Sequence, residues 1–305
     1  MWYSERRYME QLKLITHNGN FHADDVFACA TLMILLEREG KQYEIIRTRD
    51  EGIIASGDYV FDIGGVDDPL INRFDHHQKG GAGVRSNTIP YASFGLVWKK
   101  YGAVVSGSET IADNIDQKLV QPIDANDNGM NLFTGTIEGV SPAIISDIVS
   151  VFRPTWKEES YDIDGAFLTL AKTAKVYLER MIVRTKDALE ASAFVEDAYA
   201  RAEDKRLIIL DGQYPAHETL EKYPEPLFVI GPRTDEKWMV KTMNKEKNSF
   251  ANRKDLPASW AGLRDAELAK VTGVADAVFC HNGRFLAVAG SKEGAIALGK
   301  LALAE

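Results

Sequence analysis

The chain has little cysteine and no long apolar run. Its two cysteines, Cys29 and Cys280, lie far apart inside apolar stretches, so they indicate buried thiols and argue against a disulfide framework or a cysteine zinc site. The longest apolar run, "VFACATLMILL" (26–36), is about half of the length that a membrane-spanning helix needs. The N-terminal "MWYSERRYMEQLK" lacks the apolar segment of a signal peptide, and it carries Glu5 and Glu10, which transit peptides avoid. We therefore expect a soluble cytoplasmic protein with no membrane partner.

Positive charge is also in deficit. The 36 lysines and arginines face 45 acidic residues, which gives a formal net charge of −9. Proteins that grip duplex DNA neutralise many phosphates with basic side chains, and this composition argues against such a grip. A metal-bridged contact to a single phosphate remains compatible with it. The acidic charge modestly favours short substrates over long polymers.

Short apolar runs alternate with helical patterns in the first half of the chain. Strands are predicted at 12–18, 43–49 and 58–65, and helices at 23–40, 91–102 and 108–127. This alternation is typical of an α/β fold with a mainly parallel sheet flanked by helices. We expect that domain at 10–160, a long helical connector at 161–205, and a smaller C-terminal α+β domain at 206–305.

Histidine is scarce, and its placement is uneven. Four of the six histidines lie within the first 77 residues, each near an aspartate. The carboxyl ends of parallel strands share one edge of a sheet, and open α/β sheets place their sites there. Four segments are expected to bring polar residues to that edge. The candidates are His17, His22, Asp24, Asp25, Asp62, Asp75, His76, His77, Asp124 and Asp127.

Aspartate and histidine without cysteine suit a hard or borderline divalent ion such as Mn²⁺ or Mg²⁺. More than four such ligands exceed the need of one tetrahedral ion and favour a two-metal site, with ions about 3.5–4 Å apart. Asp62, on the central segment, is the candidate bridge.

Each of these residues also has a purely structural interpretation. His17 could bond to backbone at a strand end, and Asp24 could cap a helix. Asp124 and Asp127 could belong to the turn before Asn128-Gly129, and the pair at 76–77 could lie on the surface.

The segment "RFDHHQ" resembles the signature of the DHH phosphoesterase superfamily, which includes single-strand exonucleases, oligoribonucleases and family II pyrophosphatases. More narrowly, five ordered segments resemble the melanocyte-proliferating-gene-1 family: "THNGNFHADDVFACATL", "RFDHHQ", "YASFGLVWKKYG", "DANDNG" and "FCHNGRFLAVAGSKEGAIALGKLAL". The resemblance runs from about Leu14 to Leu303. Members are described as metal-dependent protein hydrolases or 3′–5′ RNA exonucleases. No residue pattern here supports the peptide-hydrolase description.

The resemblance implies roles for the candidates. The first superfamily motif is a histidine, three residues, an aspartate, one residue and a second aspartate. Here Asp24 takes the second aspartate's place and His22 the first's, and an insertion leaves the choice between His17 and His22 open. The remaining assignments are these: Asp62 bridges metals, His76 binds metal, His77 faces the substrate phosphate, Asp124 or alternatively Asp127 is the fourth-motif ligand, Asp25 orients a ligand, and Asp75 ligates weakly or orients a histidine.

The C-terminal domain resembles the superfamily's substrate-binding domain. That domain often carries a Gly-Gly-His element, and the corresponding stretch "NGRFLAVAGSKEGA" lacks it. Candidate phosphate or nucleotide contacts are Arg284, Ser291, Lys292, Arg253 and Lys254, together with Arg85 in the flexible "KGGAGVRSN". The alternative is that these are ordinary surface charges and that the glycine-rich stretch is a bare loop.

The function expected is a Mn²⁺-dependent phosphoesterase with two ions, Mg²⁺ being the alternative metal. It would act as a 3′–5′ exonuclease on single-stranded RNA or short oligonucleotides, through a water activated by the two metals, with no protein nucleophile. The alternatives are a pyrophosphatase-like enzyme acting on a small phosphate ester, and a non-catalytic binding protein that keeps the fold. The sequence leaves open whether the chain forms a homo-oligomer.

Overall fold

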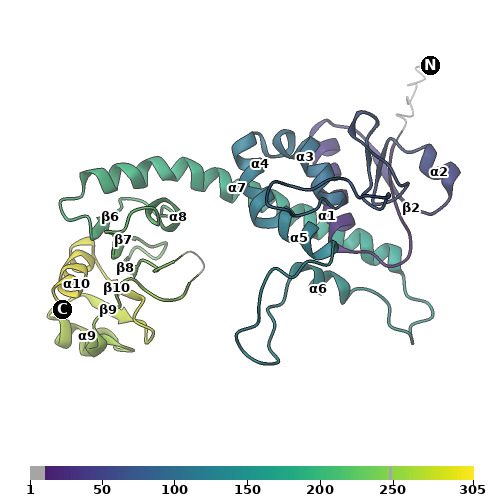
Figure 1. Ribbon diagram of the computed structural model, residues 1–305. Helices are drawn as coiled ribbons and strands as arrows, with labels where there is room; N and C mark the ends of the chain where they lie inside the picture. Colours follow the sequence, from purple (N-terminus) through teal and green to yellow (C-terminus); the bar gives the residue numbers. More distant parts are fainter. Residues whose placement is uncertain (1–10, 247–248) are drawn as a thin grey trace, which may run out of the picture. The chain divides into compact units, whose positions relative to one another are not determined.

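The computed structural model describes residues 11–246 and 249–305 (Figure 1). Two predictions lie outside the described residues: the start of the first domain at residue 10, and most of the N-terminal segment "MWYSERRYMEQLK". The chain divides into two compact units between residues 185 and 186, each with hydrophobic core of its own. The division falls inside one helix, and the boundaries expected at 160 and 205 stay predictions.

The first unit is built on a five-stranded sheet with the order β2-β1-β3-β5-β4. Its strands are β1 (Leu12–Thr16), β2 (Tyr43–Arg47), β3 (Tyr59–Phe61), β4 (Asp67–Asp68) and β5 (Arg73–Phe74). β1 pairs in parallel with β2 and β3, β3 pairs in parallel with β5, and β4 pairs antiparallel with β5. The carboxyl ends of β1, β3 and β5 therefore meet at one edge.

Helices pack around this sheet. They are α1 (Ala23–Arg38), α2 (Glu51–Ala55), η1 (Pro69–Ile71), α3 (Ser93–Ser106), α4 (Glu109–Ile115), the π-helical turn η2 (Asp116–Val120), α5 (Gln121–Asp127), α6 (Ile145–Ser150) and α7 (Ile163–Arg201). Every residue of α1 from 23 to 36 is buried, as expected of a helix that is apolar on all sides. This burial carries the acidic first turn of α1 into the core.

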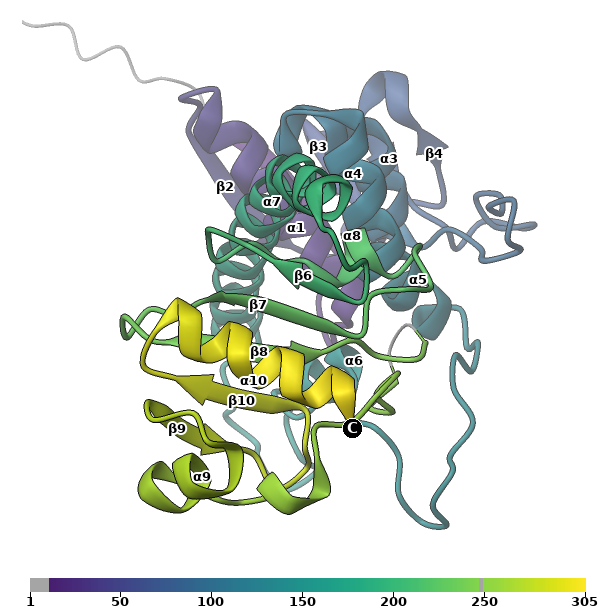
Figure 2. The same ribbon diagram turned by 90° about the vertical axis from the view of Figure 1, so that its left-hand side faces the viewer.

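The second unit has a sheet with the order β6-β7-β8-β10-β9, mostly antiparallel (Figure 2). Its elements are β6 (Leu207–Ile209), α8 (His217–Leu220), β7 (Phe228–Pro232), β8 (Trp238–Thr242), η3 (Ala258–Trp260), α9 (Asp265–Thr272), β9 (Ala277–Cys280), β10 (Leu286–Ala289) and α10 (Lys292–Ala304). α10 lies across one face and packs on Phe228, Ile230 and Val240. The other face meets α8 and the end of α7 through Ile208 and Val229.

The expectation of an α/β protein with helices flanking its sheets is confirmed, and the long helix predicted at the connector is α7. Both cysteines are buried and neither forms a disulfide, as predicted. Among the described residues, no helix is long and apolar enough to cross a bilayer.

Candidate metal centre

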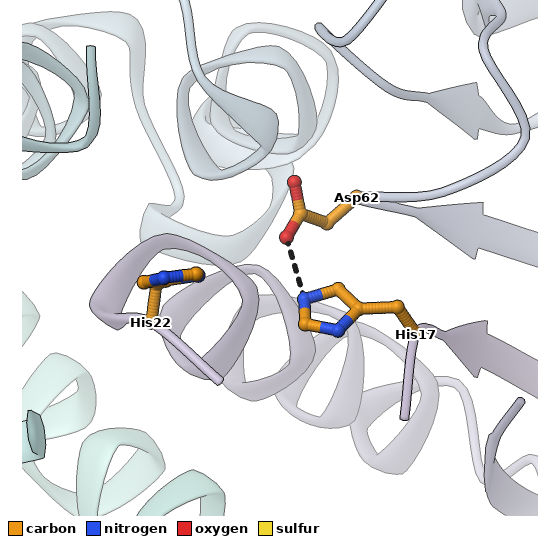
Figure 3. A group of neighbouring side chains, drawn as sticks. All are labelled: His17, His22 and Asp62. Carbon is orange, nitrogen blue, oxygen red and sulfur yellow. Dashed lines mark hydrogen bonds and ion pairs between the residues drawn. The ribbon is translucent and has the colours of Figure 1, made fainter. Parts of the chain in front are cut away.

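Three of the four predicted segments follow strands at the shared edge. His17 comes directly after β1, Asp62 after β3, and the segment 75–77 after β5. In Figure 3, His17 and Asp62 point toward one another from the ends of neighbouring strands, and His22 lies at the start of α1. The fourth segment is different from the prediction, because Asp124 and Asp127 lie on helix α5 and not at the end of a strand.

Asp62 lies at the centre of the cluster. Its Oδ2 is 3.1 Å from Nε2 of His17, and its Oδ1 is 3.3 Å from Nε2 of His76. The hydroxyl of Ser93 donates to the same Oδ1 at 3.0 Å. Asp62 has a backbone φ of 57°, which is uncommon outside glycine and recurs at functional sites. Oδ2 thus faces His17, and Oδ1 faces His76 and His77.

The charge state of Asp62 follows from these contacts. Burial on its own would raise the pKa of this carboxyl group. Hydrogen bonds to His17 and His76, with the positive charges of His17 and His77, outweigh burial and hold the pKa of Asp62 below its ordinary value. The central ligand is therefore ionised at neutral pH.

Asp24 is a fully buried carboxylate without a hydrogen-bond partner for either oxygen among the described residues. Its Oδ2 lies 3.9 Å from Nε2 of His76. Burial, followed by the charges of Asp62 and Asp127, raises the pKa of Asp24 well above its ordinary value. A buried carboxyl group without partners is costly unless a cation compensates it. The donor set therefore fits a metal, and the capping interpretation fails because His22 occupies the cap position of α1.

Three overlapping groups of side chains could each hold an ion: His17 with His22 and Asp62; Asp62 with His76 and His77; and His22 with Asp24 and Asp127. Within each group, the ligand atoms lie within 4.8 Å of one another. Asp62 belongs to two of the groups, which is the arrangement of a carboxylate shared by two ions. The structure also brings both His17 and His22 to the site.

Both ring nitrogens of His17 have partners. Nδ1 lies 3.1 Å from the carbonyl oxygen of Asn18, so Nδ1–H donates there and Nε2 faces the carboxylates. Nε2 lies 3.3 Å from Oδ2 of Asp25, and Oδ1 of Asp25 accepts the backbone N–H of His22 at 2.9 Å. Burial lowers the pKa of His17, but Asp25 and Asp62 outweigh it and raise the pKa to about 10. Asp25 thus contacts the ring of His17 and fixes the backbone at His22.

Asp75 holds the ring of His77 in a similar way. Its Oδ2 accepts the N–H of Gly65 at 2.6 Å, and its Oδ1 lies 2.7 Å from Nδ1 of His77. The hydrogen bond to Asp75 is the largest cause of a raised pKa at His77. The side chain of His77 is 61% exposed, so its outer edge can meet a ligand in solvent.

Asp124 and Arg85 form a close ion pair. Oδ2 of Asp124 lies 2.7 Å from Nη1 of Arg85, and its Oδ1 accepts the N–H of Gly95 at 3.0 Å. Arg85 is 7% exposed and also pairs with Asp116 at 3.0 Å. This ion pair gives Asp124 and Arg85 a structural role, and their assignment as metal ligand and phosphate contact stays a prediction. Asp127 lies beside the cluster, with Oδ2 3.3 Å from Nε2 of His76.

Two hollows flank the cluster and share His22, Asp62 and His77. One, of about 480 Å³, also holds the helix α6 residues Ser146 and Ser150 with Arg153; the other, of about 750 Å³, holds Asn18, Asn20, Arg49, Gly64 and Gly65. Sequence reasoning missed Ser93, Arg49 and Arg153. Arg49 closes the segment 43–49 that was predicted as a strand, so the rule that identified His17 could have found it. Nothing in the sequence around Ser93 or Arg153 carries such a signal.

The predicted substrate contacts of the C-terminal domain all lie in the second unit, where each has a structural partner. Arg253 donates to four backbone carbonyls, Lys254 to the carbonyl of Leu303, and Arg284 to Asp255. Ser291 caps α10 and donates to Asp276, and Lys292 lies over the ring of Trp238. These contacts favour the structural alternative for the five residues.

The chain matches the family model MYG1_exonuc, described as "Uncharacterised protein family (UPF0160)", over residues 13–303. It is 30% identical to the human protein named "MYG1 exonuclease", over 99% of this chain and 88% of that protein. The mouse protein of the same name is 31% identical, over 95% and 84% of the two chains. A Schizosaccharomyces pombe "MYG1 protein" is 30% identical, over 96% and 97%. A match over nearly the whole chain, together with these relatives, places the chain in the MYG1 family.

Proposed function

We propose that the chain is a divalent-metal-dependent phosphoesterase of the DHH type, acting as a 3′–5′ exonuclease on RNA or short oligonucleotides. The observation that carries the proposal is Asp62, whose two oxygens face His17 and His76 beside the unpartnered carboxylate of Asp24. Relatives at about 30% identity that bear the name MYG1 exonuclease support it.

The residues that would hold two ions are His17, His22, Asp24, Asp62, His76 and Asp127. When bound there, two Mn²⁺ ions, or alternatively Mg²⁺, would neutralise a phosphate and lower the pKa of a water to make a nucleophile near neutral pH. No Ser or Cys is needed as a nucleophile.

The chain's own contribution at the phosphate is His77. Asp75 accepts from Nδ1–H of His77 and raises the pKa of His77, which favours the cationic ring, and the other ring nitrogen is presented outward. A positioned cation stabilises the charge that develops on a phosphoryl oxygen. The same carboxylate also fixes the backbone of His77, because the backbone N–H of His77 donates to Oδ1 of Asp75 at 3.2 Å.

The two hollows on either side of the cluster suit a strand of one or a few nucleotides. Arg49 lines one hollow and Arg153 lines the other, so each flank offers a guanidinium near the metal cluster. Two isolated arginines and a net charge of −9 favour a short substrate over a long polymer.

The test is hydrolysis of end-labelled single-stranded RNA by the purified protein with Mn²⁺. We expect stepwise release of mononucleotides, abolished by Asp62→Asn and unchanged by Asp113→Asn, which alters an exposed acid on α4. Intact RNA together with hydrolysis of pyrophosphate would instead indicate a small-molecule phosphohydrolase. Fewer than about one bound ion per chain after Mn²⁺ is supplied would indicate a non-catalytic protein.

A further inference from the structure

The second unit holds a cavity of about 790 Å³ that the metal centre does not use. It lies on the face of the sheet opposite to α10. Successive residues of a strand point to opposite faces of the sheet. The strand residues that face away from α10 line the cavity: Val229 and Gly231 on β7, and Met239 and Lys241 on β8. α8 and the end of α7 cover only part of this face, through Leu220 and Val195. The uncovered part of the face is the cavity.

The floor of the cavity is apolar and carries one flat ring. Leu210, Val229, Met239 and Met243 line it, and Tyr214 lies at its side. The Tyr214 ring stacks on Phe194 with 5.0 Å between centroids and 6° between planes, so its orientation is fixed. Apolar side chains with a fixed aromatic ring are the usual surroundings of a planar, weakly polar group such as a nucleobase.

His217 places a polar atom among these apolar residues. Its Nε2 is buried and has no hydrogen-bond partner among the described residues, although it lines the cavity. Burial, and then the charges of Lys241 and Arg253, lower the pKa of His217, so the imidazole is neutral at pH 7. A buried polar atom without a partner is costly, and a ligand with a complementary polar edge would remove that cost.

Among the described residues, four lysine and arginine side chains line the cavity, and two of them have no ion-pair partner there. Lys222 pairs with Glu196, and Arg253 donates to the backbone carbonyls of Glu221, Tyr223, Pro226 and Asn244. Lys241 and Lys245 are exposed at the rim, and neither forms an ion pair with a residue in the described part of the chain. Three glutamates, Glu218, Glu221 and Glu246, also lie at the rim, so the excess of positive charge is small.

We propose that this cavity binds one nucleoside monophosphate unit, with the base on the apolar floor beside Tyr214 and His217 and the phosphate on Lys241 and Lys245. The assignment rests on the proposed exonuclease function, which supplies a ligand that combines a planar base with a phosphate. It replaces the contacts predicted at Arg284, Ser291 and Lys292, which are engaged within the fold.

The test is calorimetric titration of the full chain with adenosine 5′-monophosphate in EDTA, which removes metal-dependent binding at the first unit. Lys241→Met should weaken binding about tenfold or more, because it removes one charge from the phosphate site while keeping most of the side chain. Lys300→Met on α10, at the opposite face, is the matched control and should leave binding unchanged.

A second variant fills the cavity without touching a charge. Gly231 has ordinary backbone geometry, and a Cβ there would meet nothing closer than the Gly212 carbonyl oxygen at 3.7 Å. Gly231→Val places a β-branched residue on strand β7 and should abolish binding by filling the cavity. Its thermal unfolding, measured alongside, separates blocking from misfolding.

The outcomes distinguish this proposal from the proposed function. Binding that depends on Lys241 and Gly231, in a protein that leaves RNA intact, would support the cavity and overturn the exonuclease. Hydrolysis of RNA without binding of the monophosphate up to about 1 mM would overturn the cavity alone. Equal binding of adenosine and its monophosphate, or binding unaffected by both variants, would also overturn it.

Discussion

Among single residues, Asp24 is the buried carboxyl group whose stability should depend most on a bound cation, because neither of its oxygens has a partner in the described part of the chain. Its pKa is raised above the ordinary 3.8, so in metal-free protein it contributes stability below pH 3.8 that is lost as pH rises through its folded-state pKa. Asp24→Asn cannot ionise, so the variant does not lose this stability as pH rises. We expect the metal-free variant to be more stable than the native chain at pH 8, by about 1–3 kcal/mol in urea unfolding, and to gain less from Mn²⁺. Asp113→Asn is the exposed control.

An Asp24→Asn variant that is less stable than the native chain without metal, and equally stabilised by Mn²⁺, would contradict this interpretation. It would mean that the carboxylate makes compensating contacts of its own and that no ion depends on it.

The histidines make metal binding depend on pH. The pKa of His17 is raised to about 10 by Asp25 and Asp62, so its pairing stabilises the metal-free fold below about pH 6.5 and is lost as pH rises through 10. A metal must displace that proton, as it must at His76, whose pKa is also raised. We expect Mn²⁺ affinity to rise about tenfold per pH unit between pH 6 and 8 for each proton released.

Calorimetry of Mn²⁺ binding in two buffers of different ionisation enthalpy measures the released protons directly. Release of at least about one proton per chain is expected at pH 7, and an affinity that does not change with pH would exclude His17 as a ligand.

The residue types and their strand-end positions were predictable, but the choice between Asp124 and Asp127 was not. Residues three apart on a helix share one face, so spacing alone gives them equal access to the cluster. Asp124 pairs with Arg85, and Gly95 leaves room for Oδ2 of Asp124, since a Cβ there would lie 1.9 Å from that oxygen. Both contacts join segments far apart in the sequence, which no local pattern reveals.

At the scale of elements, two arginines hold the loop between β1 and α1 that carries His17 and His22. Arg47, on β2, donates to the carbonyl of Gly19 at 2.6 Å, pairs with Asp164, and lies 4.7 Å above the centroid of Phe167. Arg153 donates to the carbonyl of Phe21 at 2.7 Å. Together with the bond from the N–H of His22 to Asp25, these two contacts hold the path of the loop.

Arg47 is therefore a positioning residue for the metal ligands. Arg47→Met should weaken Mn²⁺ binding about tenfold, because outer partners that orient ligands commonly contribute that much. Arg38→Met is the control, since Arg38 donates to the carbonyl of Val105 and carries no ligand loop. Equal Mn²⁺ affinity in the two variants would show that Arg47 supports only the fold.

Long periodic elements were predictable and short ones were not. The buried α1 and the long α7 have apolar residues at helical spacing over many turns, so their type was clear from the sequence. β4 and β5 are two residues each, too short for any periodicity. The stretch 277–290 is a hairpin of β9 and β10. Its turn includes Arg284 with a φ of 56°, a conformation that usually favours glycine, so the residue type at this position does not predict it.

At the scale of the whole molecule, the metal centre belongs to one of two units. Its candidate ligands all lie on segments before residue 128, within the first unit, whereas the cavity proposed for a nucleotide lies between residues 210 and 253 in the second. Mn²⁺ should therefore slow amide hydrogen exchange in α1, β1 and β3 and leave β7 and β8 unchanged. Adenosine 5′-monophosphate in EDTA should give the reverse pattern. Protection of β7 and β8 by Mn²⁺ alone would contradict separate sites.

The central claim is that Asp62 is shared by two ions, and counting bound Mn²⁺ tests it most directly. Elemental analysis after equilibration with Mn²⁺ and removal of excess should give about two ions per chain in the native protein. Asp62→Asn should lose both, while the control Asp113→Asn keeps both. A native chain that holds fewer than about one ion, or an Asp62→Asn variant that still holds two, would contradict the account.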